Sequence, residues 1–373
     1  MMQYTTKYVG LDVSKDTIAV AIAEAGRERA RYWGTIQNEP AAVRKLIRQL
    51  GKKEELEVCY EAGPTGYGLY RLLKDMGVSC VVVAPSLIPA RPGERVKTDR
   101  RDALRLAELH RAGELTGVYV PTAEDEALRD LVRARDDARE DVHRAKQRLI
   151  KFLLRHGIRK PEHLKNRWTK RYRAWLGTLK FELAAQETTF RKYLHAIYEA
   201  EERVRRIETS LLEVASEGAH AKVVEALQGL KGVAFLTAVC LVAEIGRFHR
   251  FRNPRQLMAY LGLVPREYSS GQTVRRGKMT KAGNGHARRL MVEAAWSYRH
   301  QPGVKGALAK RLEGMDADIQ MISWKAQTRL YGKYRRLVAR GKQKNVAIAA
   351  VAREFVGFVW AVACLAESGQ QSA

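Results

Sequence analysis

Four carboxylates in the first third of the chain have the residue types and positions needed for metal-assisted phosphoryl transfer. Asp12 and Glu61 each lie in or directly after an apolar, strand-like run, whereas Asp99 and Asp102 stand three residues apart at the start of a helical pattern. That spacing places both on one helix face. Clustered carboxylates repel one another unless a cation neutralises them, and Mg²⁺ prefers oxygen ligands. The set predicts a Mg²⁺ site like those of nucleases and polymerases.

A single member of this set would carry little weight. Asp99 could simply cap the first turn of a helix, and Asp102 could pair with a neighbouring arginine. Asp12 is the most informative, because an acid flanked by Leu11 and Val13 in a central strand needs a partner. The hypothesis therefore depends on all four carboxylates reaching the same place.

The pattern of residues 1–120 predicts the elements that would bring them together. Alternating or apolar runs predict strands, and apolar residues at helical spacing predict helices. The predicted strands cover 7–13, 17–23, 29–36, 56–60 and 78–84, and the predicted helices cover 40–49, 67–76 and 99–111. Three antiparallel strands, a helix, a strand, a helix, a strand and a final helix is the order of the RNase H-like (RuvC-like) fold. In that fold one carboxylate lies on the first strand, one follows the fourth, and the last lies on the final helix.

The rest of the chain is predicted to be helical and to form two further parts. Residues 121–217 contain two long helical patterns, 122–156 and 178–215, which predict an antiparallel hairpin or a dimerising coiled coil. Between them, the aromatic and basic stretch 167–175 suits stacking on RNA, but equally on DNA. Residues 218–373 are predicted to form a mostly helical C-terminal domain. The fold class is thus α/β followed by α.

Two segments of this last part could contact phosphates. Residues 227–239 resemble a helix-hairpin-helix, in which Gly229 and Gly232 would make a tight turn whose amides approach a phosphate. The glycine-rich segment 264–289 is predicted to be a loop, and it carries seven Lys or Arg against one acid, Glu267.

The charge distribution favours a nucleic-acid partner. The 373 residues carry a net charge of +26, and residues 218–373 alone hold 26 Lys and Arg against nine Asp and Glu, a net +17. Such a field attracts phosphate backbones through counterion release. We ranked an anionic membrane surface well below nucleic acid, since no long basic amphipathic helix with a bulky apolar face is evident.

Other features indicate a cytosolic protein. No apolar run approaches the roughly 20 residues of a membrane span, and the first residues lack the apolar stretch of a signal peptide. The four cysteines, at 59, 80, 240 and 364, are widely spaced and show no pattern typical of zinc ligands. We interpret them as reduced thiols, three of them buried, and predict no zinc site.

Five ordered motifs resemble the DEDD transposases of bacterial insertion sequences. They are Gly-Leu-Asp-Val-Ser-Lys (10–15), Tyr-Glu-Ala-Gly-Pro-Thr-Gly (60–66), Lys-Thr-Asp-Arg-Arg-Asp-Ala (97–103), Tyr-Leu-Gly-Leu-Val-Pro-Arg-Glu-Tyr-Ser-Ser-Gly (260–271) and Met-Thr-Lys-Ala-Gly-Asn (279–284). The resemblance covers nearly the whole chain and is weakest in the helical middle and at the C-terminal end. One departure is Lys-Gly-Val-Ala (231–234), where the family usually has Pro-Gly-Ile-Gly.

The resemblance implies an RNA-guided DNA recombinase, now called a bridge recombinase. It assigns Asp12, Glu61, Asp99 and Asp102 to the metal-binding set, and Ser270 to the nucleophile that forms a covalent 5′-phosphoserine link. It also implies a structured non-coding guide RNA that pairs with donor and target double-stranded DNA, and dimers that assemble into a tetramer in which one protomer's metal site works with another's serine. In a bacterium such a protein would be cytoplasmic, and nucleoid-associated when on DNA.

The residues alone would not single out Ser270. A serine in Ser-Ser-Gly is commonly a turn residue, and Ser269 is an equally good local candidate. His286 is close enough in sequence to suggest a Ser-His dyad, but we interpret it as a solvated or capping residue. Basic residues near the serine could clamp the same phosphates; they are Arg266, Arg275, Arg276, Lys278 and Lys281.

Two other functions are also compatible with the sequence. One is a Mg²⁺-dependent, structure-selective DNA nuclease of the junction-resolving kind, which hydrolyses with water and uses Ser270 only structurally. The other is a non-enzymatic RNA- or DNA-binding protein on an inactive RNase H-like scaffold, which the complete set of four carboxylates disfavours.

Overall fold

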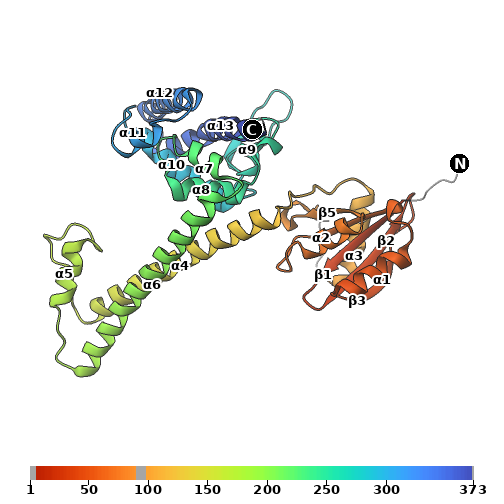
Figure 1. Ribbon diagram of the computed structural model, residues 1–373, viewed down its shortest axis with the longest axis horizontal. Helices are drawn as coiled ribbons and strands as arrows, with labels where there is room; N and C mark the ends of the chain where they lie inside the picture. The colour runs from red at the N-terminus through yellow and green to blue at the C-terminus, as the bar shows by residue number, and fades with distance from the viewer. Residues whose placement is uncertain (1–5, 90–97, 372–373) are drawn as a thin grey trace. The chain divides into compact units, whose positions relative to one another are not determined.

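A computed structural model describes residues 6–89 and 98–371 (Figure 1). The chain divides into two compact units, Met1–Pro121 and Thr122–Ala373. The first unit is built on a sheet, and the second is almost entirely helical. The division into domains 1–120, 121–217 and 218–373 stays a prediction.

The N-terminal unit contains a five-stranded sheet in the order β3-β2-β1-β4-β5. Its strands are β1 (Lys7–Val13), β2 (Thr17–Glu24), β3 (Arg31–Gln37), β4 (Leu56–Glu61) and β5 (Ser79–Val83). The first three strands pair antiparallel, while β4 runs parallel to β1 and to β5. The central position of β1 follows from its apolar residues, since Val9 and Leu11 are almost fully buried.

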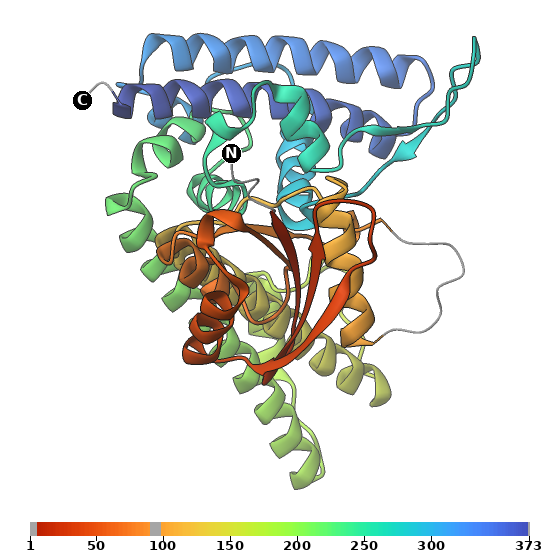
Figure 2. The ribbon, with the colours of Figure 1, turned by 90° about the vertical axis from the view of Figure 1, so that its right-hand side faces the viewer.

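Helices cover both faces of this sheet (Figure 2). Helices α1 (Pro40–Leu50) and α2 (Gly68–Asp75) share a core with Val9, Leu11, Val58 and Tyr60. On the opposite face, α3 (Asp99–Arg111) packs its Ala103 and Ala107 against alanines of β2. Because strand side chains alternate, Gly10 and Asp12 of β1 face α3.

Small residues let α3 lie close to the sheet. A Cβ added to Gly10 would come within 2.3 Å of the Ala103 carbonyl oxygen and 2.5 Å of the Ala107 nitrogen. Glycine at this position is therefore required by the approach of one backbone to another. Thr98, the residue before the helix, caps it by accepting a hydrogen bond from the Arg101 amide. Helix α3 therefore begins at Asp99.

The second unit begins with two long antiparallel helices. These are α4 (Ala123–Arg155) and α6 (Ala184–Glu217), connected through α5 (Lys170–Thr178). Polar contacts hold their middle section, where Glu208 accepts from Arg135 at 2.6 Å and Glu201 lies 2.6 Å from Lys146. At the α5 end, Tyr172 is buried, and Trp168 and Trp175 pack beside it. These aromatic residues thus belong to a core, which differs from the stacking surface considered from the sequence.

The remaining helices pack around the apolar α13. They are α7 (Ala221–Leu227), α8 (Phe235–Ile245), α9 (Pro254–Tyr260), α10 (Gly285–Ala295), α11 (Ala307–Leu312), α12 (Ala317–Ala339) and α13 (Lys344–Gln371). Val351, Phe355, Val359 and Val362 of α13 are fully buried in the core that these helices form. The sequence predicted no apolar run of membrane-spanning length, and this was wrong, since residues 344–369 are long and apolar enough. Burial of these side chains explains that composition.

The mixed α/β sheet and the helical remainder confirm the predicted fold class at that level. The segment 264–289 was predicted as a loop, and this was wrong in part. It contains a two-stranded hairpin of β6 (Pro265–Glu267) and β7 (Arg276–Met279), visible in Figure 2 as the projecting ribbon that follows α9. Alternation is too short here to predict strands, because the two strands have three and four residues.

Candidate active site

Register places Asp12 and Glu61 at neighbouring positions of the sheet. Leu11 of β1 pairs with Tyr60 of β4 in parallel register, so Asp12 and Glu61 come next on adjacent strands. Cys59 donates to the Leu106 carbonyl of α3, which shows that this side of β4 faces α3. Glu61 lies two residues further on, so it faces α3 too. Both carboxylates therefore lie on the α3 side of the sheet, at the carboxyl end of two parallel strands.

Helix α3 runs antiparallel to β1, and this brings its first turn to the same end. The Tyr8 ring contacts the His110 ring at a centroid distance of 5.6 Å, so the start of β1 lies against the end of α3. Gly10, further along β1, lies against Ala103 and Ala107. Asp12, the next residue on this face, is thus directed to the first turn, where Asp99 and Asp102 each stand four residues before a buried residue of α3, Ala103 and Leu106. The four predicted ligands lie at one edge of the sheet.

These carboxylates are exposed enough for a solvent-accessible metal site, in contrast to a site enclosed by protein ligands. Asp12, Glu61 and Asp102 are half-buried, and Asp99 is exposed. In the described parts of the chain, no three of the four place carboxylate oxygens within 4.8 Å of one another. Mg²⁺ usually keeps several waters and takes only one or two carboxylates plus substrate phosphates. These four residues would therefore suit a divalent ion that is held by only one or two carboxylates at a time.

Ser270 lies at the tip of the β6–β7 hairpin. It exchanges two backbone hydrogen bonds of 3.1 Å with Thr273 across Gly271 and Gln272. Gly271 has φ of 58°, a left-handed value that favours glycine in a two-residue turn. The Ser270 side chain is exposed, whereas the neighbouring Ser269 hydroxyl donates to Glu267 at 2.9 Å. The turn therefore leaves the Ser270 side chain exposed to solvent, whereas the Ser269 hydroxyl is hydrogen-bonded to Glu267.

The predicted phosphate-binding residues near the serine are exposed where they are described. Arg266, Arg275, Lys278 and Lys281 all present their side chains to solvent, and the side chain of Arg276 lies outside what the structure describes. Lys281 has φ of 56°, an unusual value for a residue with a Cβ. Its amide donates to the Gly262 carbonyl at 3.2 Å, which fixes the base of the hairpin.

Both glycines of the turn between α7 and α8 have close contacts within the chain. Gly229 is buried, its amide donates to Ala226 and its carbonyl accepts from Ser323 at 2.6 Å. The Gly229 amide is thus bonded within the chain, and its contact with a phosphate stays a prediction. A Cβ at Gly232 would lie 2.5 Å from the Ala294 carbonyl oxygen, so glycine is explained there by packing, and its phosphate contact stays a prediction.

Sequence reasoning missed an ionic cluster around Glu244. This residue is 1% exposed on the apolar helix α8, and it is held by Arg133 at 3.0 Å and by Asn284 at 2.6 Å. His286 lies between two carboxylates, 3.0 Å from Asp136 and 3.4 Å from Glu244. The interpretation of His286 as solvated or capping was wrong. One signal was available: a lone acid in Leu-Val-Ala-Glu-Ile requires buried partners.

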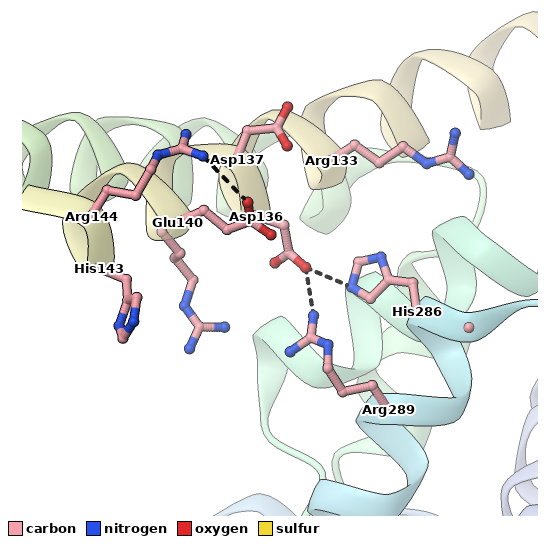
Figure 3. Close-up of a pocket in the computed structure, with 10 residues that line it drawn as sticks. Arg133, Asp136, Asp137, Glu140, His143, Arg144, His286 and Arg289 are labelled. Atoms are coloured by element: carbon pink, nitrogen blue, oxygen red, sulfur yellow. Dashed lines mark hydrogen bonds and ion pairs between the residues drawn. The ribbon is translucent and has the colours of Figure 1, made fainter. Parts of the chain in front are cut away.

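Three residues of this cluster, Arg133, Asp136 and His286, line a cavity between α4 and α10 (Figure 3). The cavity has a volume of about 860 Å³, and Asp136 lies within it between His286 and Arg289, the latter at 2.6 Å. Its lining carries charges of both signs, since Arg133, Arg139, Arg144 and Arg289 line it together with Asp136, Asp137 and Glu140. We interpret it as a structural connection between α4 and the C-terminal helices.

The cluster predicts a marked pH dependence of stability. Hydrogen bonds that His286 donates to Asp136 and then to Glu244 raise its pKa from 6.5 to about 9. Because the folded-state value is the higher one, this stabilisation is complete below pH 6.5 and is lost as the pH rises through about 9. We expect the melting temperature to fall between pH 7 and 10 more steeply for the wild type than for His286→Asn. His163→Asn, at an exposed site, is the control. Parallel curves for wild type and His286→Asn would contradict the assignment.

Removing the buried acid should destabilise the second unit. Burial raises the pKa of Glu244, but hydrogen bonds from His286, Arg133 and Asn284 outweigh it and hold the value at about 2. Glu244→Ala leaves these partners without their shared anion, so we expect a loss of about 3 kcal/mol in the free energy of unfolding. Denaturant unfolding measures it, with exposed Glu293→Ala as the matched control. Equal stability of the two variants would show that the cluster is not stabilising.

A second small cluster joins the end of α13 to the segment after α8. The Nδ1 atom of His249 lies 2.6 Å from Glu367, and Cys364 completes a group of three possible ligands. Glu367 also accepts hydrogen bonds from the Phe248 and His249 amides at 2.7 and 2.9 Å. Both of its oxygens are thereby engaged, and the cluster is explained as an anchor for α13.

Comparisons with known proteins decide the family. Residues 9–158 match the DEDD transposase family of IS110 elements, and residues 224–307 match the family described as "Transposase IS116/IS110/IS902 family". The chain is 47% identical over 362 residues to y4qE of Sinorhizobium fredii, which is named as a transposase, covering 96% of this chain and 89% of y4qE. The chain belongs to the IS110/IS116 family of insertion-sequence transposases.

A second relative supports the same placement. The transposase for insertion sequence element IS1533 of Leptospira borgpetersenii is 34% identical over 340 residues, covering 90% of this chain and 98% of that protein. The first match includes the four carboxylates, and the second includes the β6–β7 hairpin that carries Ser270. Membership in a transposase family implies DNA substrates, and the DEDD family indicates a divalent metal ion.

Proposed function

We propose that this transposase cuts and rejoins DNA strands with two sets of groups, the carboxylate edge and Ser270. The proposal rests on one observation: a single edge of the sheet carries all four acids, Asp12, Glu61, Asp99 and Asp102. We call this edge the carboxylate edge. The strand order β3-β2-β1-β4-β5 supports an RNase H-like assignment, as do α1 and α2 on one face of the sheet and α3 on the other.

The four carboxylates would hold the divalent metal, for which Mg²⁺ fits best. The donor set is entirely oxygen and carries four negative charges, which suits a hard cation. When bound, the metal would withdraw charge from the scissile phosphate. The contribution of the chain is to hold Asp12 and Glu61 on rigid neighbouring strands and the two other acids on a capped helix.

Ser270 would act as the nucleophile on the DNA phosphate. Its oxygen forms a bond to phosphorus, its proton passes to solvent or a base, and the bond from phosphorus to the 3′ oxygen breaks. The 3′ oxygen leaves and takes up a proton, while the 5′ phosphate stays on serine. One phosphate ester replaces another, so attack by a 3′ hydroxyl on phosphoserine reseals a strand without ATP.

Exposure of Ser270 at a tight turn supports this role. A nucleophile that must reach the phosphate of a bulky duplex has to project from its own domain, and the hairpin tip does so. Arg266, Arg275, Lys278 and Lys281 would then contact neighbouring phosphates of the same strand. His286 is an unsuitable base for the serine, because its two nitrogens face Asp136 and Glu244.

RNA guidance and assembly complete the proposal and rest on the family resemblance. A non-coding guide RNA would pair with donor and target DNA, and dimers would assemble into a tetramer that combines the metal site of one protomer with the serine of another. The net +17 of residues 218–373 supports binding of such a polyanion. The protein would act in the cytoplasm, at the nucleoid.

Sequencing the nucleic acid that copurifies with the protein tests the guided mechanism. The protein should be expressed together with its native flanking DNA. We expect one discrete, structured RNA from the non-coding end of the element, with loops that match donor and target. Heterogeneous cellular RNA or DNA alone would contradict RNA guidance and would favour a transposase that reads DNA directly, or the metal nuclease.

A further inference from the structure

Helix α12 carries a row of cations on one side. Its core face buries Ile319, Ala326 and Leu330. Arg329, Lys333, Arg336 and Arg340 follow one another at spacings of four, three and four residues, so they lie along one side of the helix. The row spans about 16 Å, at about 1.5 Å per residue.

These residues line a groove between α12 and α13, which lie side by side in Figure 2. The groove, here called the α12 groove, has a volume of about 430 Å³ and is formed by Arg329, Lys333, Arg336, Leu337, Arg340 and Glu354. It holds four cations and one carboxylate. The α4–α10 cavity differs, because three carboxylates there offset the arginines.

Glu354 of α13 engages only half of the row. It pairs with Arg329 and with Lys333, the latter at 2.7 Å. Among the residues that the structure describes, no carboxylate lies within ion-pair distance of Arg336 or Arg340, and both side chains are exposed. The C-terminal half of the row therefore presents uncompensated positive charge, which would favour an anionic ligand.

We infer that the α12 groove binds the phosphodiester backbone of nucleic acid, as a site separate from the serine hairpin. A linear row of cations matches a linear polyanion, since duplex DNA carries one charge per about 1.7 Å of its axis. A membrane surface would need bulky apolar side chains beside the cations, and the groove offers only the half-buried Leu337. The site would hold DNA or RNA away from the reacting phosphate. The inference rests on the proposed function only in that the chain acts on nucleic acid.

The test compares salt dependences of binding by the full-length chain, with EDTA present so that no strand is cut. The test variant is Arg336→Gln/Arg340→Gln. The matched control is Arg335→Gln/Lys310→Gln, which removes the same charge from exposed positions outside the groove. Each is titrated with duplex DNA, single-stranded DNA and an RNA hairpin of equal length. A third variant, Glu354→Gln, raises the net positive charge of the groove, because it removes the carboxylate that pairs with Arg329 and Lys333.

Each phosphate contact contributes about 0.9 to the slope of log K against log salt for duplex DNA. We expect the groove variant to lower the slope by about 2 with the backbone that the site uses, and Glu354→Gln to bind that backbone several-fold more tightly. The nucleic acid whose slope falls, DNA or RNA, is the one that the groove binds. Equal slopes for the groove and control variants with all three nucleic acids would overturn the inference. Because Ser270→Ala removes chemistry without touching the groove, failure of the serine mechanism would leave these slopes unchanged.

Discussion

Replacing Asp12 by asparagine is expected to reduce DNA strand cleavage by about 10³-fold or more while leaving DNA binding intact. Metal-derived stabilisation of a phosphoryl transition state amounts to several kcal/mol, and each 1.36 kcal/mol is tenfold in rate. Asp12 lies on the central strand, beside the position of Glu61 and toward the first turn of α3, so its loss would remove the proposed ligand with the most constrained position. Cleavage of a labelled substrate over a range of Mg²⁺ concentrations measures the effect.

Asp16→Asn is the matched control for this prediction. This substitution removes the same charge four residues away, and Asp16 is exposed in the turn between β1 and β2. We expect its cleavage rate to stay near that of the wild type. If Asp12→Asn and Asp16→Asn cut DNA equally well, the carboxylate edge is not the metal site, and an inactive scaffold that only binds nucleic acid becomes the better account.

The second large effect is expected from Ser270→Ala, which should abolish the covalent protein–DNA adduct and recombination together. Removing a nucleophile from a catalytic set lowers turnover by orders of magnitude, commonly more than 10³-fold. Ser269→Ala is an unusually close control, because the two hydroxyls are adjacent and Ser269 donates to Glu267. Denaturing gels of the protein with a labelled substrate separate the adduct from free DNA.

The rival nuclease predicts a different result for the same pair. If water is the nucleophile, Ser270→Ala should still cut DNA, and neither serine variant should differ from the wild type in adduct formation. Loss of the adduct in Ser269→Ala and its retention in Ser270→Ala would assign the nucleophile to the other serine.

Much of the N-terminal unit could be predicted because its signals are local. The alternation in 7–13 and 17–23 and the apolar run 78–84 predicted strands that β1, β2 and β5 confirm within a residue or two. Thr98 followed by Asp99 predicted the start of α3, and the cap is present. That the acids reach one edge also required the antiparallel course of α3, which depends on the packing of Gly10 against Ala103.

The C-terminal unit was less predictable because its decisive contacts join distant residues. The contact between Asp136 and His286 spans 150 positions, and the one between Arg133 and Glu244 spans 111. No local pattern pairs them, although an acid in an apolar helix signals that partners exist. At Gly229 a turn motif suggests phosphate binding, but close packing against Met315 and Ile319, which no local pattern shows, also accounts for the glycine.

The most direct test of the central claim is to map the covalent link in the wild-type protein. The protein is incubated with substrate DNA and Mg²⁺, denatured, and digested with nuclease and trypsin, and the modified peptide is sequenced by mass spectrometry. Cleavage after Arg266 and Arg275 releases one peptide, residues 267–275, that contains both Ser269 and Ser270. The account predicts a nucleotide attached through its 5′ phosphate to Ser270. Cut DNA with free 5′ phosphates and no modified peptide would contradict it and would establish hydrolysis by water.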